Sequence, residues 1–255
     1  MYTYESIHEP KQFTYDVAER VTEKLIEYSF ISKGEKDLLK MVQYSFLEDV
    51  NERLLFNFGF GDYNFSNGII ADNTISNNGD TYKVFNTVLS TVPRFFEIQH
   101  NAILQVKGSD SSPKFADACR ASCRKNCVDT CSNADRRINI YRRYVNKHYD
   151  VLKNDYTIYG GLIRTKDKKI MIDYAPDQKQ ESIFLTRNKN QHGMKTEENQ
   201  TQEVMEPTTE EEMWALYFKQ REAANWCDLF PEQTAAAREY IKGLVLPDEL
   251  RLDNK

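Results

Sequence analysis

The segment from residue 113 to residue 148 is the part of this chain best suited to chemistry, because it carries nine bases and three acids. Arg136, Arg143 and Lys147 recur there at helical spacing on one face, with Tyr144 at its edge. Cationic side chains neutralise phosphates, and an aromatic ring can stack on a base. The pattern predicts nucleic-acid contact, with RNA favoured over DNA. The alternatives are a solvated helix face or a docking surface for an acidic segment.

Four cysteines in the same region recur every four residues: Cys119, Cys123, Cys127 and Cys131. On one unbroken helix they would extend over about 18 Å, too far for all four to reach a single ion. A break near Asn126 would instead let two pairs face each other. Such a hairpin could hold zinc, the only cofactor the sequence suggests, or form two disulfides. The alternative is a set of free thiols on a semi-exposed helix.

A third group of residues would suit phosphate chemistry. Gly108 and Ser109 follow a short apolar stretch, where backbone amides can approach a phosphate, although a plain turn needs the same residues. If the protein is catalytic, phosphodiester cleavage is the expected class. Arg142 and Arg143 would then steady the phosphate, and Asp80 or Lys83 would assist proton transfer. Helix caps and turns use the same residue types, so a structural role is the alternative.

The elements that must position these residues show two hydrophobic periods along the chain. A period of two residues is typical of strands, and one of three to four residues is typical of helices. They predict an α+β fold, a mostly antiparallel sheet with helices packed on one face. A central helix lies between a turn at 77–79 and a second turn near 100–101. A strand over 102–106 follows it, and 135–149 forms a second helix. A short helix is expected within 16–27 and a loop over 61–73. The expected strands are 26–30, 42–46, 54–60, 156–163, 169–174 and 182–187.

The chain of 255 residues divides by composition. We expect a body over 1–187 with a cysteine-containing insertion at about 110–134, a polar linker over 188–208, and a tail over 209–255. From Lys195 onward, 7 Lys and Arg face 14 Asp and Glu, a net charge of −7, whereas the preceding residues carry +2. No export signal or bilayer-spanning apolar stretch is visible, which favours the cytoplasm and no membrane contact.

The tail opens with a capping box at 209–212, which predicts a helix start. Trp214, Phe218 and Trp226 follow on two short helices that cannot bury their aromatic area alone. We therefore expect these helices to dock on the body or on a partner protein.

Three stretches, NNGDTYKVFNTV, the strand ending in KGS, and INIYRR with the following NKHYDVL and DYTIYG, resemble an uncharacterised domain family found mainly in Bacteroidota. The likeness covers about residues 25–187, and the family implies no established activity. An Arg of the family's helix motif is Asn139 here. Residues 110–134 look like an insertion, which places the cysteines outside the shared part. The tail from Met194 resembles a small separate reading frame joined to the body.

These observations lead to two hypotheses. In the first, a basic body contacts nucleic acid and the acidic tail covers that surface, as in a fused toxin–antitoxin or phage-defence module, since a tethered acidic segment competes at high effective concentration. In the second, the protein is a non-enzymatic interaction module whose aromatic tail helices engage a partner protein. The sequence leaves the oligomeric state and the question of catalysis open.

Overall fold

The computed structural model describes residues 13–71, 78–111, 113–122, 127, 131–165, 168–188, 210–223, 228–242, 244–247 and 250. Among them, nine strands form one sheet in the order β1-β2-β3-β4-β6-β9-β7-β8, with β5 paired to β4. All pairs are antiparallel except β4 with β6. The predicted α+β class is confirmed.

The strands are β1 (Ala18–Val21), β2 (Leu25–Ser32), β3 (Leu38–Val50), β4 (Arg53–Asn64), β5 (Ile69–Ala71), β6 (Ile103–Val106), β7 (Tyr156–Thr165), β8 (Lys168–Asp173) and β9 (Ser182–Arg187). The helices are α1 (Thr81–Ile98), α2 (Pro113–Ser122), α3 (Arg136–Asp155), α4 (Glu210–Ala223) and α5 (Pro231–Ile241), with one 3-10 turn, η1 (Ser109–Ser111).

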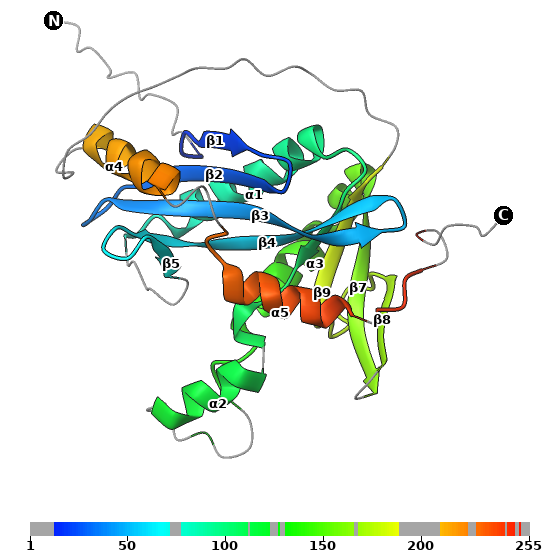
Figure 1. Cartoon of the computed structure of the whole chain (residues 1–255). Helices are drawn as coiled ribbons and strands as arrows, with labels where there is room; N and C mark the ends of the chain where they lie inside the picture. Colours follow the sequence, from blue (N-terminus) through cyan, green and yellow to red (C-terminus); the bar gives the residue numbers. More distant parts are fainter. Residues whose placement is uncertain are drawn as a thin grey trace, which may run out of the picture.

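The helices lie on both faces of the sheet (Figure 1). Helices α1 and α3 cover one face, as predicted for the body, while α4 and α5 of the tail cover the other. A sheet with apolar side chains on both faces needs a layer on each side to exclude water. The tail supplies the second layer.

The core beneath α1 is aromatic. Phe95 stacks on Tyr44 of β3 with ring centroids 4.4 Å apart, and it meets Phe56 of β4 edge-on at 5.3 Å. The Tyr44 hydroxyl lies 2.7 Å from the hydroxyl of Thr91, so its polar end is satisfied inside the core. Burial raises the pKa of Tyr44 far above its usual value. These contacts hold α1 against the centre of the sheet.

Helix α5 packs on the second face of the sheet at two glycines. A Cβ added to Gly59 of β4 would lie 2.8 Å from the ring of Phe230, and one added to Gly161 of β7 would lie 2.6 Å from the Tyr240 hydroxyl. The side chains at the two ends of α5 therefore rest directly on the backbone of the sheet. The small residues of β4, whose alternation with Phe56 and Phe58 is visible in the sequence, admit a packing element rather than a ligand.

Two local predictions were wrong. Residues 16–27 form β1 and the start of β2 instead of a helix, and the predicted loop over 61–73 contains the end of β4 and β5. In both places the ladder to the neighbouring strand decides the conformation, because cross-strand pairing outweighs intrinsic propensity.

Replacing Gly59 with Val should displace the Phe230 ring and destabilise the protein by about 1–3 kcal/mol, as overpacking does. Chemical unfolding of the single variants and of the Gly59→Val, Phe230→Ala double variant would measure this as a coupling energy. Additive effects would show that the two residues do not depend on each other.

Candidate functional site

Helix α3 starts after Asp135, which takes a left-handed conformation with φ of 59°. Its inner face buries Ile138 and Val145 against the sheet. The opposite face carries Arg136, Arg143 and Lys147, all exposed. The structure thus brings together three of the bases predicted to contact phosphate.

Aromatic residues border these bases on the side of α1. The Tyr144 ring lies 5.3 Å from that of Phe85 on α1 and 4.5 Å from that of His148. Burial raises the pKa of the half-buried Tyr144. Tyr82, at the start of α1, is 88% exposed. We call the following exposed or partly exposed residues of the two helices the α1–α3 surface: Tyr82, Phe85, Asn86, Arg136, Arg143, Tyr144, Lys147 and His148.

Arg142 turns away from this surface. Its guanidinium donates to the Asn139 side chain at 2.6 Å and to the Gln180 carbonyl at 3.2 Å. Arg137 likewise donates to the Ser109 hydroxyl. These two guanidinium groups bond to loops next to α3, and both side chains are only partly exposed.

Asp80 and Lys83, predicted to assist catalysis, belong to a clasp at the start of α1. The Asp80 carboxylate accepts hydrogen bonds from Tyr15 at 2.8 Å and from Ser32 at 2.6 Å. The Lys83 ammonium sits 4.0 Å from the centre of the Tyr15 ring, and Asn78 donates to the Lys36 carbonyl at 2.8 Å. The clasp ties the N-terminal segment and the β2–β3 connection to α1. In the described part of the chain Arg142 bonds to Asn139 and Gln180 and not to the clasp, so the three predicted catalytic residues do not form one constellation.

Gly108 and Ser109 form a turn against the start of α3. The Asp110 carboxylate accepts from the Arg137 backbone amide at 3.1 Å, and the Asp110 carbonyl accepts from the Asp135 amide at 3.3 Å. The chain's own carboxylate therefore caps α3 where an anion would sit. A phosphate at the predicted site would have to displace Asp110.

The cysteines lie on α2 and the segment after it. The Asn133 amide donates to the Cys119 sulfur at 3.2 Å, and Cys127 and the Ser132 hydroxyl are 3.2 Å apart. Cys123 lies outside the described residues. Among the described ones, Cys131 included, no group of three or more His, Cys, Asp and Glu is placed to hold a metal. The zinc site stays a prediction.

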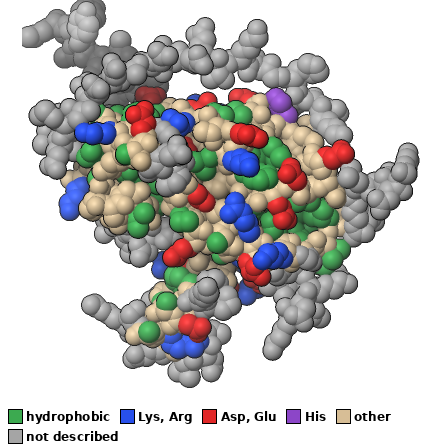
Figure 2. Space-filling view, in the orientation of Figure 1, with side chains coloured by type: hydrophobic (Ala, Val, Ile, Leu, Met, Phe, Trp, Pro, Cys, Tyr) green, Lys and Arg blue, Asp and Glu red, His purple; other side chains and the backbone are tan. Residues whose placement is uncertain are grey.

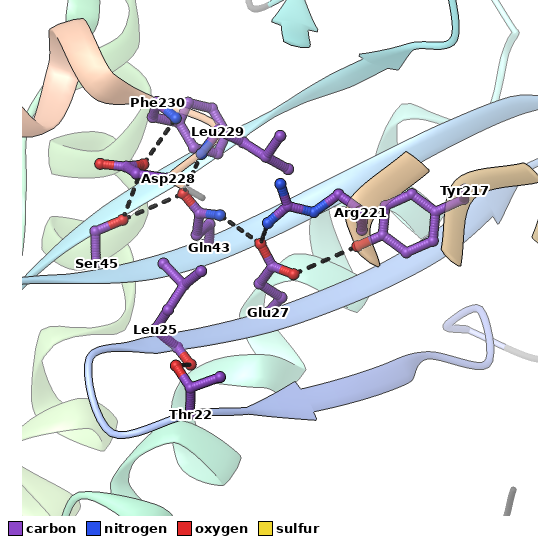
Figure 3. Close-up of polar contacts among 10 residues, drawn as sticks. All are labelled: Thr22, Leu25, Glu27, Gln43, Ser45, Tyr217, Arg221, Asp228, Leu229 and Phe230. Atoms are coloured by element: carbon purple, nitrogen blue, oxygen red, sulfur yellow. Dashed lines mark hydrogen bonds and ion pairs between the residues drawn. The ribbon is translucent and has the colours of Figure 1, made fainter. Parts of the chain in front are cut away.

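Helix α4 docks on the other face of the sheet through a buried ion pair. The Arg221 guanidinium donates to Glu27 of β2, and both side chains are at most 2% exposed (Figure 3). Gln43 of β3 donates to the same carboxylate at 2.5 Å, and the Tyr217 hydroxyl approaches it at 3.5 Å. Burial raises the pKa of Glu27, and the positive charge of Arg221 opposes that shift.

The turn into α5 extends the same network. The Leu229 backbone amide donates to the side-chain oxygen of Gln43 at 3.0 Å, and the Ser45 hydroxyl donates to Asp228 at 3.3 Å. Asp228 in turn accepts from the Phe230 amide at 2.8 Å. The first two of these contacts join residues far apart in the sequence, whereas the contact between Asp228 and Phe230 is local. We call five buried polar residues that run across neighbouring strands of this sheet face the polar strip: Glu27, Gln43, Ser45, Asn57 and Gln105.

The aromatic residues of the tail serve mainly this docking. Tyr217 is buried on the sheet, and Trp214 stacks beside Phe218, which remains 39% exposed. Trp226 lies outside the described residues. Helices α4 and α5 dock on the body, which is one of the two expected arrangements. Contact of Trp214 and Phe218 with a partner protein stays a prediction.

The tail does not cover α3 in the described part of the chain, contrary to the expectation from net charge. It packs on the opposite face, where positive and negative side chains are interspersed (Figure 2). Buried apolar area and one desolvated ion pair outweigh the attraction between net charges, which salt screens within about 10 Å. Sequence reasoning also missed the polar strip. The available signal was a polar residue between two apolar ones, as in Glu27 between Ile26 and Tyr28 and Gln105 between Leu104 and Val106.

Comparison with known proteins finds a family match for part of the chain. Residues 11–114 match DUF6934, a family of unknown function. This confirms the expected resemblance to an uncharacterised domain, over a shorter stretch than predicted. The DUF6934 segment spans β1 to β6 and all five residues of the polar strip, whereas α3 and the tail lie beyond it. No curated protein and no solved structure matches the chain. None of the helices in the described ranges is long and apolar enough to cross a membrane.

Removing Arg221 should leave Glu27 buried without its cation. We expect Arg221→Met to lose about 3–5 kcal/mol of stability at neutral pH. Because the folded-state pKa of Glu27 lies above its ordinary value, and further above without Arg221, stability should rise as pH falls through that pKa.

Urea unfolding at neutral and mildly acidic pH measures both effects. The variant should recover more stability on acidification than the wild type. Lys242→Met, which breaks the exposed pair with Glu239, is the control and should change little. Equal losses at both pH values would show that Glu27 is not the titrating group.

Proposed function

We propose that the α1–α3 surface binds a single strand of nucleic acid. The observation that carries the proposal is the alignment of Arg136, Arg143 and Lys147 on the exposed stripe of α3. Asp150, an exposed acid on the same helix, is paired with Lys153 at 2.6 Å, which reduces its repulsion of a phosphate backbone.

The aromatic border of the surface supports a single strand rather than a duplex. Successive bases of a single strand can stack on aromatic side chains while the backbone follows a cationic groove or stripe. Tyr82 offers an open ring, and Tyr144, next to Arg143 in the sequence, is partly exposed beside Phe85. We expect RNA to bind in preference to DNA.

The proposal is one of binding without cleavage, because Asp80 and Lys83 are committed to the clasp and Arg142 points elsewhere. A fused toxin–antitoxin or phage-defence role remains a broader proposal. In that version the tail would restrain the body from the opposite sheet face, and would not act by covering α3.

Fluorescence anisotropy with a labelled oligomer of about 12 uridines tests the proposal. Neutralising three phosphates predicts a log–log salt slope of about −2, and therefore more than about a tenfold loss of affinity between about 50 and about 200 mM salt. Arg143→Glu with Lys147→Glu should abolish most of the binding. Tyr82→Ala should weaken it by about 1–3 kcal/mol if a base stacks there.

The matched control is Lys219→Glu with Lys242→Glu, which makes the same charge change on the tail helices. Equal losses from the two double variants would mean that only net charge matters, and would contradict a specific surface. A deoxyuridine oligomer of the same length tests the preference for RNA.

A further inference from the structure

We infer that the polar strip is a binding site for a partner polypeptide, and that α4 and α5 occupy it as an internal ligand that can be displaced. This inference does not depend on nucleic-acid binding, because it concerns the other face of the sheet.

The strip is contiguous across four strands. Glu27 of β2 pairs in register with Gln43 of β3, and Ser45 of β3 pairs with Asn57 of β4, which pairs with Gln105 of β6. All five side chains are at most 5% exposed. Apolar clusters flank the strip on both sides, one under α4 and one under α5. A polar row is costly in the middle of a covered sheet face, where apolar residues would fill the same space.

The tail satisfies one half of the strip and leaves Gln105 unmet. Glu27, Gln43 and Ser45 all bond to groups from the tail or to each other. The Gln105 side chain is fully buried, yet neither its oxygen nor its nitrogen has a hydrogen-bond partner among the described residues. The buried Thr234 hydroxyl of α5 is likewise unmet within the described part.

The course of α5 places it over Gln105. Its first end rests on Gly59 of β4, and its last turn reaches Gly161 of β7 and bonds Ser182 of β9 at 3.1 Å. Strand β6 lies between β4 and β9, so the middle of α5 crosses the strand that carries Gln105. A buried amide without partners destabilises the covered state. The tail is therefore an imperfect occupant of a site with more hydrogen-bonding capacity than it uses.

The extent of the family match separates the strip from the helices that cover it, and supports the same inference. Every residue of the strip lies within the DUF6934 segment, and the residues that cover it, including Tyr217, Arg221 and Asp228, lie outside it. The contacts of the tail indicate the chemistry of a better occupant. Such a polypeptide would bring a guanidinium to Glu27, an aromatic ring to Gly59, and a backbone or side-chain amide to Gln105.

A pair of chemically identical substitutions tests whether the cover is imperfect. In the full chain, Gln105→Leu should slow hydrogen exchange of the α5 amides by about tenfold, because it removes an unmet amide from the covered state. Gln43→Leu should accelerate the same amides, because it removes bonds to Glu27 and Leu229. If both variants accelerate exchange, or if α5 exchanges only with global unfolding, the inference is wrong.

A peptide of residues 209–247, fluorescently labelled, tests displacement. It should bind full-length Phe230→Ala, whose own α5 has lost an anchor, at least tenfold more tightly than the wild type. Adding Glu27→Gln should weaken that binding, whereas adding Gln105→Leu should not, since the tail does not use Gln105. Failure of the peptide to bind a Phe230→Ala protein with native far-UV circular dichroism would show that the contact is permanent packing only.

Discussion

A sheet of nine strands with apolar side chains on both faces must be covered on both, and this constraint organises the whole molecule. In the described part of the body, α1 and α3 pack on the same side of the sheet and cover one face. Water is excluded from the other face by α4 and α5, which arrive from the far end of the chain. The position of the tail is therefore set by uncovered apolar area rather than by its negative charge.

The second interface differs from the first in polarity. Under α1 the contacts include aromatic stacks and a hydroxyl pair, whereas under the tail a buried ion pair and several amides lie between apolar clusters. A buried ion pair adds little net stability, because the cost of removing two charges from water offsets their attraction. It constrains the position of the two elements more than it stabilises their contact. Arg221 thus fixes where α4 lies, and the apolar clusters supply the driving force. An interface of this kind is better suited to opening than the aromatic core opposite.

The same separation of faces bears on function. Because the tail occupies one side of the sheet, the exposed bases of α3 are left accessible on the other side in the described structure. A nucleic-acid strand and a partner polypeptide would then use different faces. The two proposals can be tested separately, and a sheet that binds on both sides could couple them through the strands they share.

Much of the fold could be predicted from sequence, because hydrophobic periodicity reports local geometry. The alternation along Phe56 and Phe58, the helical stripe containing Val88 and Phe95, and the polar face of α3 all follow from it. What a one-dimensional pattern lacks is the identity of the partner across a long separation. Asp80 and Lys83 looked catalytic because caps and active sites use the same residue types, and only the contacts to Tyr15 and Ser32 distinguish the two roles.

The sequence by itself determined that the chain forms an α+β sheet with a basic helix and an acidic, aromatic tail that needs a surface to dock on. Only the tertiary structure decided which surface, because Glu27 and Arg221 are 194 residues apart and nothing local couples them. Net charge is a sum over the chain and does not say where each charge lies in the fold. Burial depends on which atoms meet, and that is known only once the sheet is assembled.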